Sequence, residues 1–209
     1  MRGALRRVLL HAALVLSACL FPSVGLGAGE LEAPVAEDRA QADRATVEGF
    51  HVTLIQVMQT PGYLAREALV APAIADVFDI PRIARVSVGR TWDELDEGQR
   101  ETFTASLERL VVATYASRFN NFDNQRFETE GTKVVRSGVV VSTNLVKSDG
   151  SLVSLDYALR DGRVFNVVAD GVSDLSLRRA DYNSIIKTHG FERLLEHIEE
   201  KIAEARDDS

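Results

Sequence analysis

The stretch GVVVSTNLVKSDGSLVSLDYALRDGRVFNVVAD, residues 138–170, contains three short runs in which apolar side chains recur at every second position. Because side chains alternate between the two faces of a β-strand, this period predicts three strands with one apolar face. Asp149-Gly150 and Asp161-Gly162 separate the runs, and such pairs favour tight hairpin turns. The stretch therefore predicts an antiparallel meander, with a weaker strand over 126–132 before it. We expect its apolar face to carry Val139, Val141, Thr143, Leu145, Val153, Leu155, Tyr157, Leu159, Phe165, Val167 and Ala169.

The segments on both sides of this sheet have the helical period of 3.6 residues. Asp79 and Asp96 are predicted helix caps, and Gln99 would complete a capping box with Asp96. The second helix is expected to end before Pro72, because proline breaks the interior of a helix. The expected helices cover 39–58, 63–71, 80–88, 97–119, 177–187 and a last segment from 191 onward.

Helices, then a sheet, then helices again is the order of an α+β fold. The sequence predicts one domain over residues 39–205, helical over 39–119, with the sheet over 125–170 and closing helices over 175–205. A flexible leader over 29–38 is expected to precede this domain.

Residues 1–28 are predicted to be a secretory signal and not part of the fold. MRGALRR supplies a positive start, and the apolar run after it ends in small residues near Gly27 and Ala28, where cleavage is expected. An alternative interpretation is that LSAC, residues 16–19, is a lipobox, so that Cys19 would become an acylated N-terminus. The residues after Cys19 stay apolar where a lipoprotein has a polar tether, which favours simple cleavage.

The charge and cysteine content exclude several classes of protein. The chain has 209 residues with 24 basic and 31 acidic side chains, a net charge of −7. Cleavage of the signal removes three arginines and no acids, which leaves a net charge of −10. Such a surface disfavours nucleic acid and non-specific adhesion to anionic lipid. Cys19 is the only cysteine, so the mature chain would have no disulfide, thiolate nucleophile or cysteine metal site.

Catalytic and metal-binding patterns are missing from the sequence of the mature chain. His51, His189 and His197 have neither the spacing nor the acidic neighbours of a metal site. Asp156 and Tyr157 are adjacent on a strand, so they point to opposite faces and cannot form one acid–base pair. These observations favour a binding protein over an enzyme, with no cofactor and no metal.

Two segments resemble one known family. The first carries Phe78-Asp79, Ala84, Gly89, Trp92, Leu95, Gln99-Arg100, Phe103 and Thr114-Tyr115, and the second carries Gly171-Val172-Ser173 followed by Tyr182 and Gly190. In this order, behind a signal peptide, they resemble the MlaC-like family of periplasmic lipid-binding proteins, also called the toluene-tolerance auxiliary-component family. The resemblance covers roughly residues 40–203.

The resemblance implies an NTF2-like sheet wrapped by helices around a deep apolar cavity. It implies a monomeric periplasmic shuttle that carries phospholipid between an outer-membrane lipoprotein–porin complex and the MCE-domain ring of an inner-membrane ABC transporter, which maintains the lipid asymmetry of the outer membrane. A hopanoid or another lipid is an alternative cargo in the same family. The residues expected to line the cavity are Ile83, Val88, Leu107, Val111, Tyr115, Val139, Val141, Val153, Leu155, Tyr157, Phe165, Val167 and Val172.

Two other hypotheses stay open on sequence alone. An NTF2-like enzyme would need an acid–base group inside the sheet, where the inward positions offer only Thr143 and Tyr157. A membrane-tethered interaction protein would need lipidation at Cys19, which cleavage after residue 27 or 28 removes.

Overall fold

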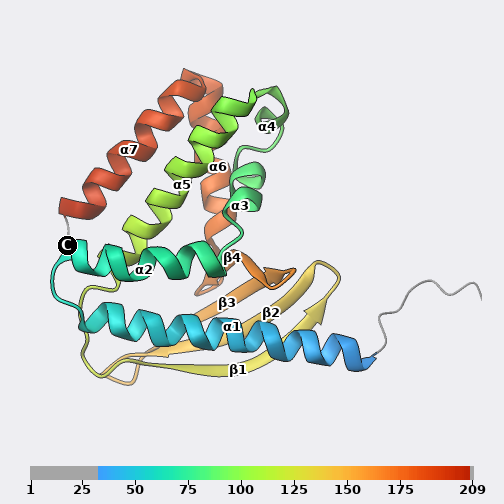
Figure 1. Ribbon diagram of the computed structural model, residues 1–209, viewed down its shortest axis with the longest axis vertical. Helices are drawn as coiled ribbons and strands as arrows, with labels where there is room; N and C mark the ends of the chain where they lie inside the picture. The colour runs from blue at the N-terminus through green and yellow to red at the C-terminus, as the bar shows by residue number, and fades with distance from the viewer. Residues whose placement is uncertain (1–32, 208–209) are drawn as a thin grey trace, which may run out of the picture. The chain divides into compact units, whose positions relative to one another are not determined.

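The computed structural model describes residues 33–207, which form an α+β fold (Figure 1). The predicted signal peptide, its cleavage site and Cys19 lie outside the described residues. The helices are α1 (Ala33–Gln59), α2 (Tyr63–Val77), α3 (Ile80–Val88), α4 (Thr91–Glu94), α5 (Glu97–Arg118), α6 (Asp174–His189) and α7 (Phe191–Asp207). The strands are β1 (Arg126–Val135), β2 (Gly138–Val146), β3 (Leu152–Arg160), β4 (Arg163–Ala169) and β5 (Val172–Ser173).

The sheet is an antiparallel meander in the order β1-β2-β3-β4-β5, as the alternating pattern predicts. Asp161 and Gly162 both have positive φ, 54° and 81°, which is the geometry of a tight hairpin turn. The short strand β5 was not predicted. It forms because Asp170 and Gly171 also take positive φ, 48° and 79°, and turn the chain back beside β4.

A β-bulge in β4 changes one expectation about the inner face. Leu159 pairs with Val164 while Ala158 pairs with Asn166, so Phe165 is an extra residue in the ladder. Strict alternation would place Val164 and Phe165 on opposite faces. Because of the bulge, Val164 is fully buried and Phe165 packs against the same core. The carbonyl oxygen of Val164 also accepts a hydrogen bond of 2.8 Å from the amide of Asp79. The bulge thus fastens β4 to the segment that begins α3.

The helices form two packed groups (Figure 1). Helix α1 lies against β1 and β2, and α2 packs on α1 and on α5. Helices α5 and α6 each pack on α7, and α6 also packs on α3 and touches β4. Three aromatic rings join the groups: Phe50 contacts Phe78 and Tyr115, with ring centroids 5.4 Å apart in both pairs. None of the helices between Ala33 and Asp207 is both long and apolar enough to cross a membrane.

The predicted caps are present. Asp79 accepts from the amide of Arg82 at 3.1 Å, and Asp96 and Gln99 form both hydrogen bonds of a capping box. Helix α6 starts three residues earlier than expected because Ser173 Oγ accepts a hydrogen bond from the amide of Ser176.

Two helix boundaries differ from the sequence-based expectation. Helix α2 does not end before Pro72 but continues through it to Val77. The buried side chains Val70 and Ile74, on either side of the proline, pack into the core and compensate for the hydrogen bond that proline cannot donate. Helix α1 begins at Ala33, so residues 33–38 of the expected leader are helical.

Gly138 is expected to tolerate no side chain. Its φ is 143°, and an added Cβ would overlap the carbonyl oxygen of Leu159 on the neighbouring strand. We expect Gly138→Ala to lower the free energy of unfolding by about 2 kcal/mol or more in urea denaturation. Gly131→Ala is the matched control, because a Cβ there meets open space and no positive φ is required. Equal stability of the two variants would contradict this reading of the β2 start.

Candidate functional site

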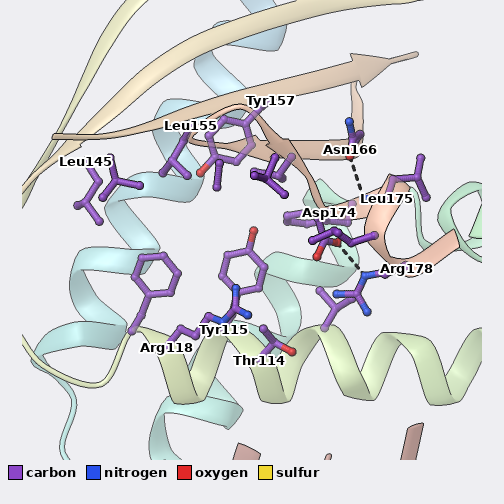
Figure 2. Close-up of a pocket in the computed structure, with 18 of the residues that line it drawn as sticks. Thr114, Tyr115, Arg118, Leu145, Leu155, Tyr157, Asn166, Asp174, Leu175 and Arg178 are labelled. Atoms are coloured by element: carbon purple, nitrogen blue, oxygen red, sulfur yellow. Dashed lines mark hydrogen bonds and ion pairs between the residues drawn. The ribbon is translucent and has the colours of Figure 1, made fainter. Parts of the chain in front are cut away.

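A cavity of about 570 Å³ lies between the inner face of the sheet, the C-terminal half of α5 and the start of α6 (Figure 2). Sixteen of its lining residues are apolar or aromatic. They are Met58, Phe78, Ile83, Val111, Tyr115, Phe119, Leu145, Val153, Leu155, Tyr157, Phe165, Val167, Ala169, Val172, Leu175 and Leu177.

Most residues that the sequence singled out lie in this lining. Sheet, α3 and α5 positions converge there although they are far apart in the chain. The residues brought together are Ile83, Val111, Tyr115, Val153, Leu155, Tyr157, Phe165, Val167 and Val172.

Four of the expected residues, Val88, Leu107, Val139 and Val141, do not line the cavity but lie in the packed core. Val139 and Val141 have the predicted inward direction, but the sheet register places them beside Leu159 and Tyr157, at the end that helices cover. The opposite end, where Leu145 pairs with Val153, faces the cavity. Alternation therefore identifies the inner face, whereas helix packing decides which half of that face stays open.

Sequence reasoning missed several lining residues. Leu145 and Ala169 share the inward parity, so the period-2 pattern contained the signal for them. Phe119 was not predicted; it stacks on Tyr115 with centroids 5.5 Å apart and planes at 7°. The α6 residues Leu175 and Leu177 reach the cavity only because the turn into β5 places the helix start at its edge.

The mouth of the cavity combines charged and exposed apolar side chains. Arg118 and Lys147 are exposed, and the described part of the chain offers neither a side-chain hydrogen bond nor an ion pair to them. Val172 and Leu177, at 51% and 60% exposure, are large apolar side chains left in water. The mouth can therefore contact both the polar and the apolar part of an amphiphile.

Asn166 of β4 joins the edge of the cavity to the start of α6. Its Oδ1 accepts a hydrogen bond of 3.1 Å from the Leu175 amide (Figure 2) and another of 3.1 Å from Ser173 Oγ. Arg178, one turn further along α6, forms an ion pair of 2.7 Å with Asp174 and a hydrogen bond to Tyr182. The Asn166 hydrogen bonds hold the start of α6 against β4, whereas the Arg178 contacts stabilise the first turns within α6 itself.

Two tyrosines from opposite walls project their rings into the cavity (Figure 2). Burial raises the pKa of both Tyr115 and Tyr157 above the usual range, so both hydroxyls are neutral. The Tyr157 hydroxyl lies 3.1 Å from Nε2 of His51. The Tyr115 hydroxyl has no hydrogen-bond partner within residues 33–207, so it can bond to a polar group of a bound molecule.

His51 lies behind Tyr157 and outside the lining. It is 5% exposed, and its ring stacks on Phe127 with centroids 4.0 Å apart and planes at 8°. Burial lowers its pKa to about 4, against the weaker opposite effect of Glu48. At neutral pH the His51–Tyr157 pair is therefore an uncharged hydrogen bond. In the described region no three histidine, cysteine or acidic side chains gather as a metal site.

A buried arginine supports the cavity wall formed by α5. Arg66 of α2, 4% exposed, donates from Nε to the carbonyl oxygen of Ala116 at 2.7 Å. A cation at a helix C-terminus also interacts favourably with the helix dipole. The contact holds the last turn of α5, which carries the lining residues Tyr115, Arg118 and Phe119.

Comparisons with known proteins agree with this geometry. The sequence profile of the MlaC protein family matches residues 52–200. A solved structure of a phospholipid-binding protein from Ralstonia solanacearum, in complex with a phospholipid, superimposes with a TM-score of 0.68 at 20% identity. The match covers 78% of this chain and 98% of that one, and at this identity it establishes the fold. No curated protein sequence matches the chain significantly.

The burial of His51 predicts a pH dependence of stability. Its folded-state pKa of about 4 lies below the unfolded value of about 6.5, so the unfolded chain binds a proton that the folded chain does not. Stability is therefore lost as the pH falls through this interval. From about pH 7.5 to about pH 4, we expect the wild type to lose about 3 kcal/mol more than His51→Gln, measured by urea denaturation. Glutamine keeps a hydrogen bond to Tyr157 without titrating, and parallel losses in both proteins would refute the assignment.

Proposed function

The chain belongs to the MlaC family, and from that premise we propose that it binds phospholipid in its cavity and carries it through the periplasm. The observation that carries the proposal is the apolar cavity between the sheet and α5, which opens at a mouth with charged side chains. The phospholipid bound by the Ralstonia solanacearum protein of the same fold supports it. The sequence resemblance to this family is confirmed by the match over residues 52–200.

The physical reason is the cost of exposing acyl chains to water. Exposing two chains with about 30 methylenes to water, at about 0.8 kcal/mol each, costs on the order of 20–25 kcal/mol of free energy. A bilayer also keeps the chains out of water. A carrier therefore needs to bind the lipid about as favourably as the membrane does, and it does not need extreme affinity. An apolar cavity provides this with few directed polar contacts, and about 570 Å³ is within the range of about 300–1,000 Å³ typical of ligand sites.

We propose the wider role on the basis of the family resemblance. A signal peptide over residues 1–28 directs the chain to the periplasm, where residues 39–205, with α1 extended back to Ala33, act as one monomeric lipid-binding domain. This domain exchanges lipid with the MCE-domain ring of an inner-membrane ABC transporter and with an outer-membrane lipoprotein–porin complex. The shuttle thereby maintains the lipid asymmetry of the outer membrane, and the ATPase belongs to the transporter.

The direct test is to identify what the purified protein holds. Native mass spectrometry with lipid extraction should recover phospholipid, and labelled vesicles should transfer it to the protein. Recovery of a polycyclic lipid instead would identify a hopanoid carrier of the same family. If the purified protein yields no lipid and takes up none from vesicles, the proposal is overturned, including the choice of a carrier over an NTF2-like enzyme.

Filling the cavity should remove the bound lipid. Val167→Trp places an indole where chain methylenes would lie, and excluding even two methylenes costs about 1.6 kcal/mol, more than about tenfold in retention. Val52→Trp is the matched control, because Val52 is 61% exposed on α1 and outside the cavity. Unchanged lipid content in folded Val167→Trp, measured by native mass spectrometry, would place the chains elsewhere.

A buried charge should distinguish the cavity wall from the core on the same face. Leu155→Asp puts a carboxylate into the cavity, where water from the mouth can solvate it, so the protein should stay folded and lose lipid. Val141→Asp puts the carboxylate into a fully buried position and should unfold the protein. Circular dichroism and lipid extraction measure the two effects. Unfolding of both variants, or lipid retention in Leu155→Asp, would contradict the assignment of Leu155 to the cavity wall and of Val141 to the core.

A further inference from the structure

We propose that a polar groove between α5, α6 and α7 holds the head group of the bound lipid and favours zwitterionic phosphate diesters that end in an ammonium group. The inference rests on the proposed function, because the groove matters only if acyl chains fill the adjoining cavity. It adds the head-group chemistry, which the apolar cavity cannot select. The groove has a volume of about 460 Å³, ample for a head group.

The groove and the cavity share a wall. Five residues border both spaces, two from α5 and three from α6, so the groove begins where the cavity ends. A lipid whose chains lie in the cavity reaches the groove by passing between these two helices. Figure 2 shows four of the five at the edge of the cavity, Thr114 and Arg118 on α5 and Asp174 and Arg178 on α6; Leu177 is the fifth.

The charged side chains of the groove are mostly paired with one another. Arg178 forms its ion pair with Asp174 at 2.7 Å, and Lys201 forms its ion pair with Glu204 at 2.6 Å. Asp174 and Glu204 are thus neutralised by their own neighbours. Neither pair leaves an uncompensated charge for a ligand.

Two side chains of opposite sign are left without such compensation. Arg118 has no carboxylate within ion-pair distance among the described residues. Between Ala33 and Asp207, Asp181 has only the imidazole of His197, 3.4 Å away, and no lysine or arginine within ion-pair distance. Lys201 influences Asp181 electrostatically but is held by Glu204. The groove therefore presents one open cation and one open carboxylate.

The positions of these two charges follow the order of groups in a zwitterionic lipid. Arg118 borders both the cavity and the groove, whereas Asp181 borders the groove alone. From the apolar cavity outward, a ligand meets a cation first and a carboxylate second. Acyl chains, phosphate and ammonium come in the same order, so the phosphate lies against Arg118 and the ammonium against Asp181.

The first test separates head groups with equal acyl chains. Purified protein takes up lipid from vesicles of equal phosphatidylethanolamine and phosphatidylglycerol, and native mass spectrometry gives the ratio bound. Partly exposed ion pairs stabilise by up to about 1 kcal/mol, so we expect the wild type to favour phosphatidylethanolamine about three- to fivefold. Asp181→Asn should abolish this preference while total lipid stays high. Asp76→Asn, an exposed change on α2 outside both spaces, should keep the wild-type ratio.

The second test locates the phosphate. Arg118→Gln should lower the retention of either phospholipid about fivefold relative to diacylglycerol with the same chains, which has no phosphate. Arg136→Gln, an exposed change on the β1–β2 turn, is the matched control. Lys147 lies on another side of the mouth, so a loss with Lys147→Gln instead of Arg118→Gln would overturn the groove assignment.

The outcomes distinguish the two levels of the proposal. If no lipid enters the wild-type protein, the proposed function fails. If lipid is bound but the wild type has no head-group preference, or Asp181→Asn keeps it, the groove inference fails while lipid binding stands.

Discussion

The hydrogen bond between Tyr157 and His51 joins the middle of the sheet to α1, and the open half of the molecule begins there. On one side of Tyr157, helices cover the inner face of the sheet and bury Val139, Leu159 and Val164. On the other side, Leu155, Val153 and Leu145 face empty space. A sheet with one continuous apolar face normally buries all of it, so the uncovered half is the property that makes this fold a container.

The start of α6 determines where that container opens. The turn at Asp170 and Gly171 returns the chain beside β4, and the Ser173 cap starts the helix at once. Its first turns carry both apolar and charged side chains to the rim. The same helix then forms one side of the polar groove, so one local chain reversal places an apolar and a polar environment next to each other.

Much of the scaffold could be predicted from the sequence because local chemistry determines it. Alternation and Asp-Gly turns identified the meander, and side-chain caps identified the starts of α3 and α5. The path of α2 through Pro72 could not be predicted, since tertiary packing there outweighs a local penalty. The division of the inner face at Tyr157 could not be predicted either, because it depends on where distant helices lie. Arg118 and Asp181 are 63 positions apart in the sequence, and only the packing of α5 and α6 on the common helix α7 brings them to one groove.

The hydrogen bonds of Asn166 have a consequence for how this architecture can diversify. The residues that hold the rim on this side lie within ten positions of one another, from Asn166 to Leu175, and the two that act through their side chains, Asn166 and Ser173, are not part of the hydrophobic core. Substitutions at these two positions can change the opening without removing a side chain from the hydrophobic core. Selectivity for cargo and robustness of the scaffold are therefore separately adjustable, which suits both natural divergence and the engineering of carriers for other amphiphiles.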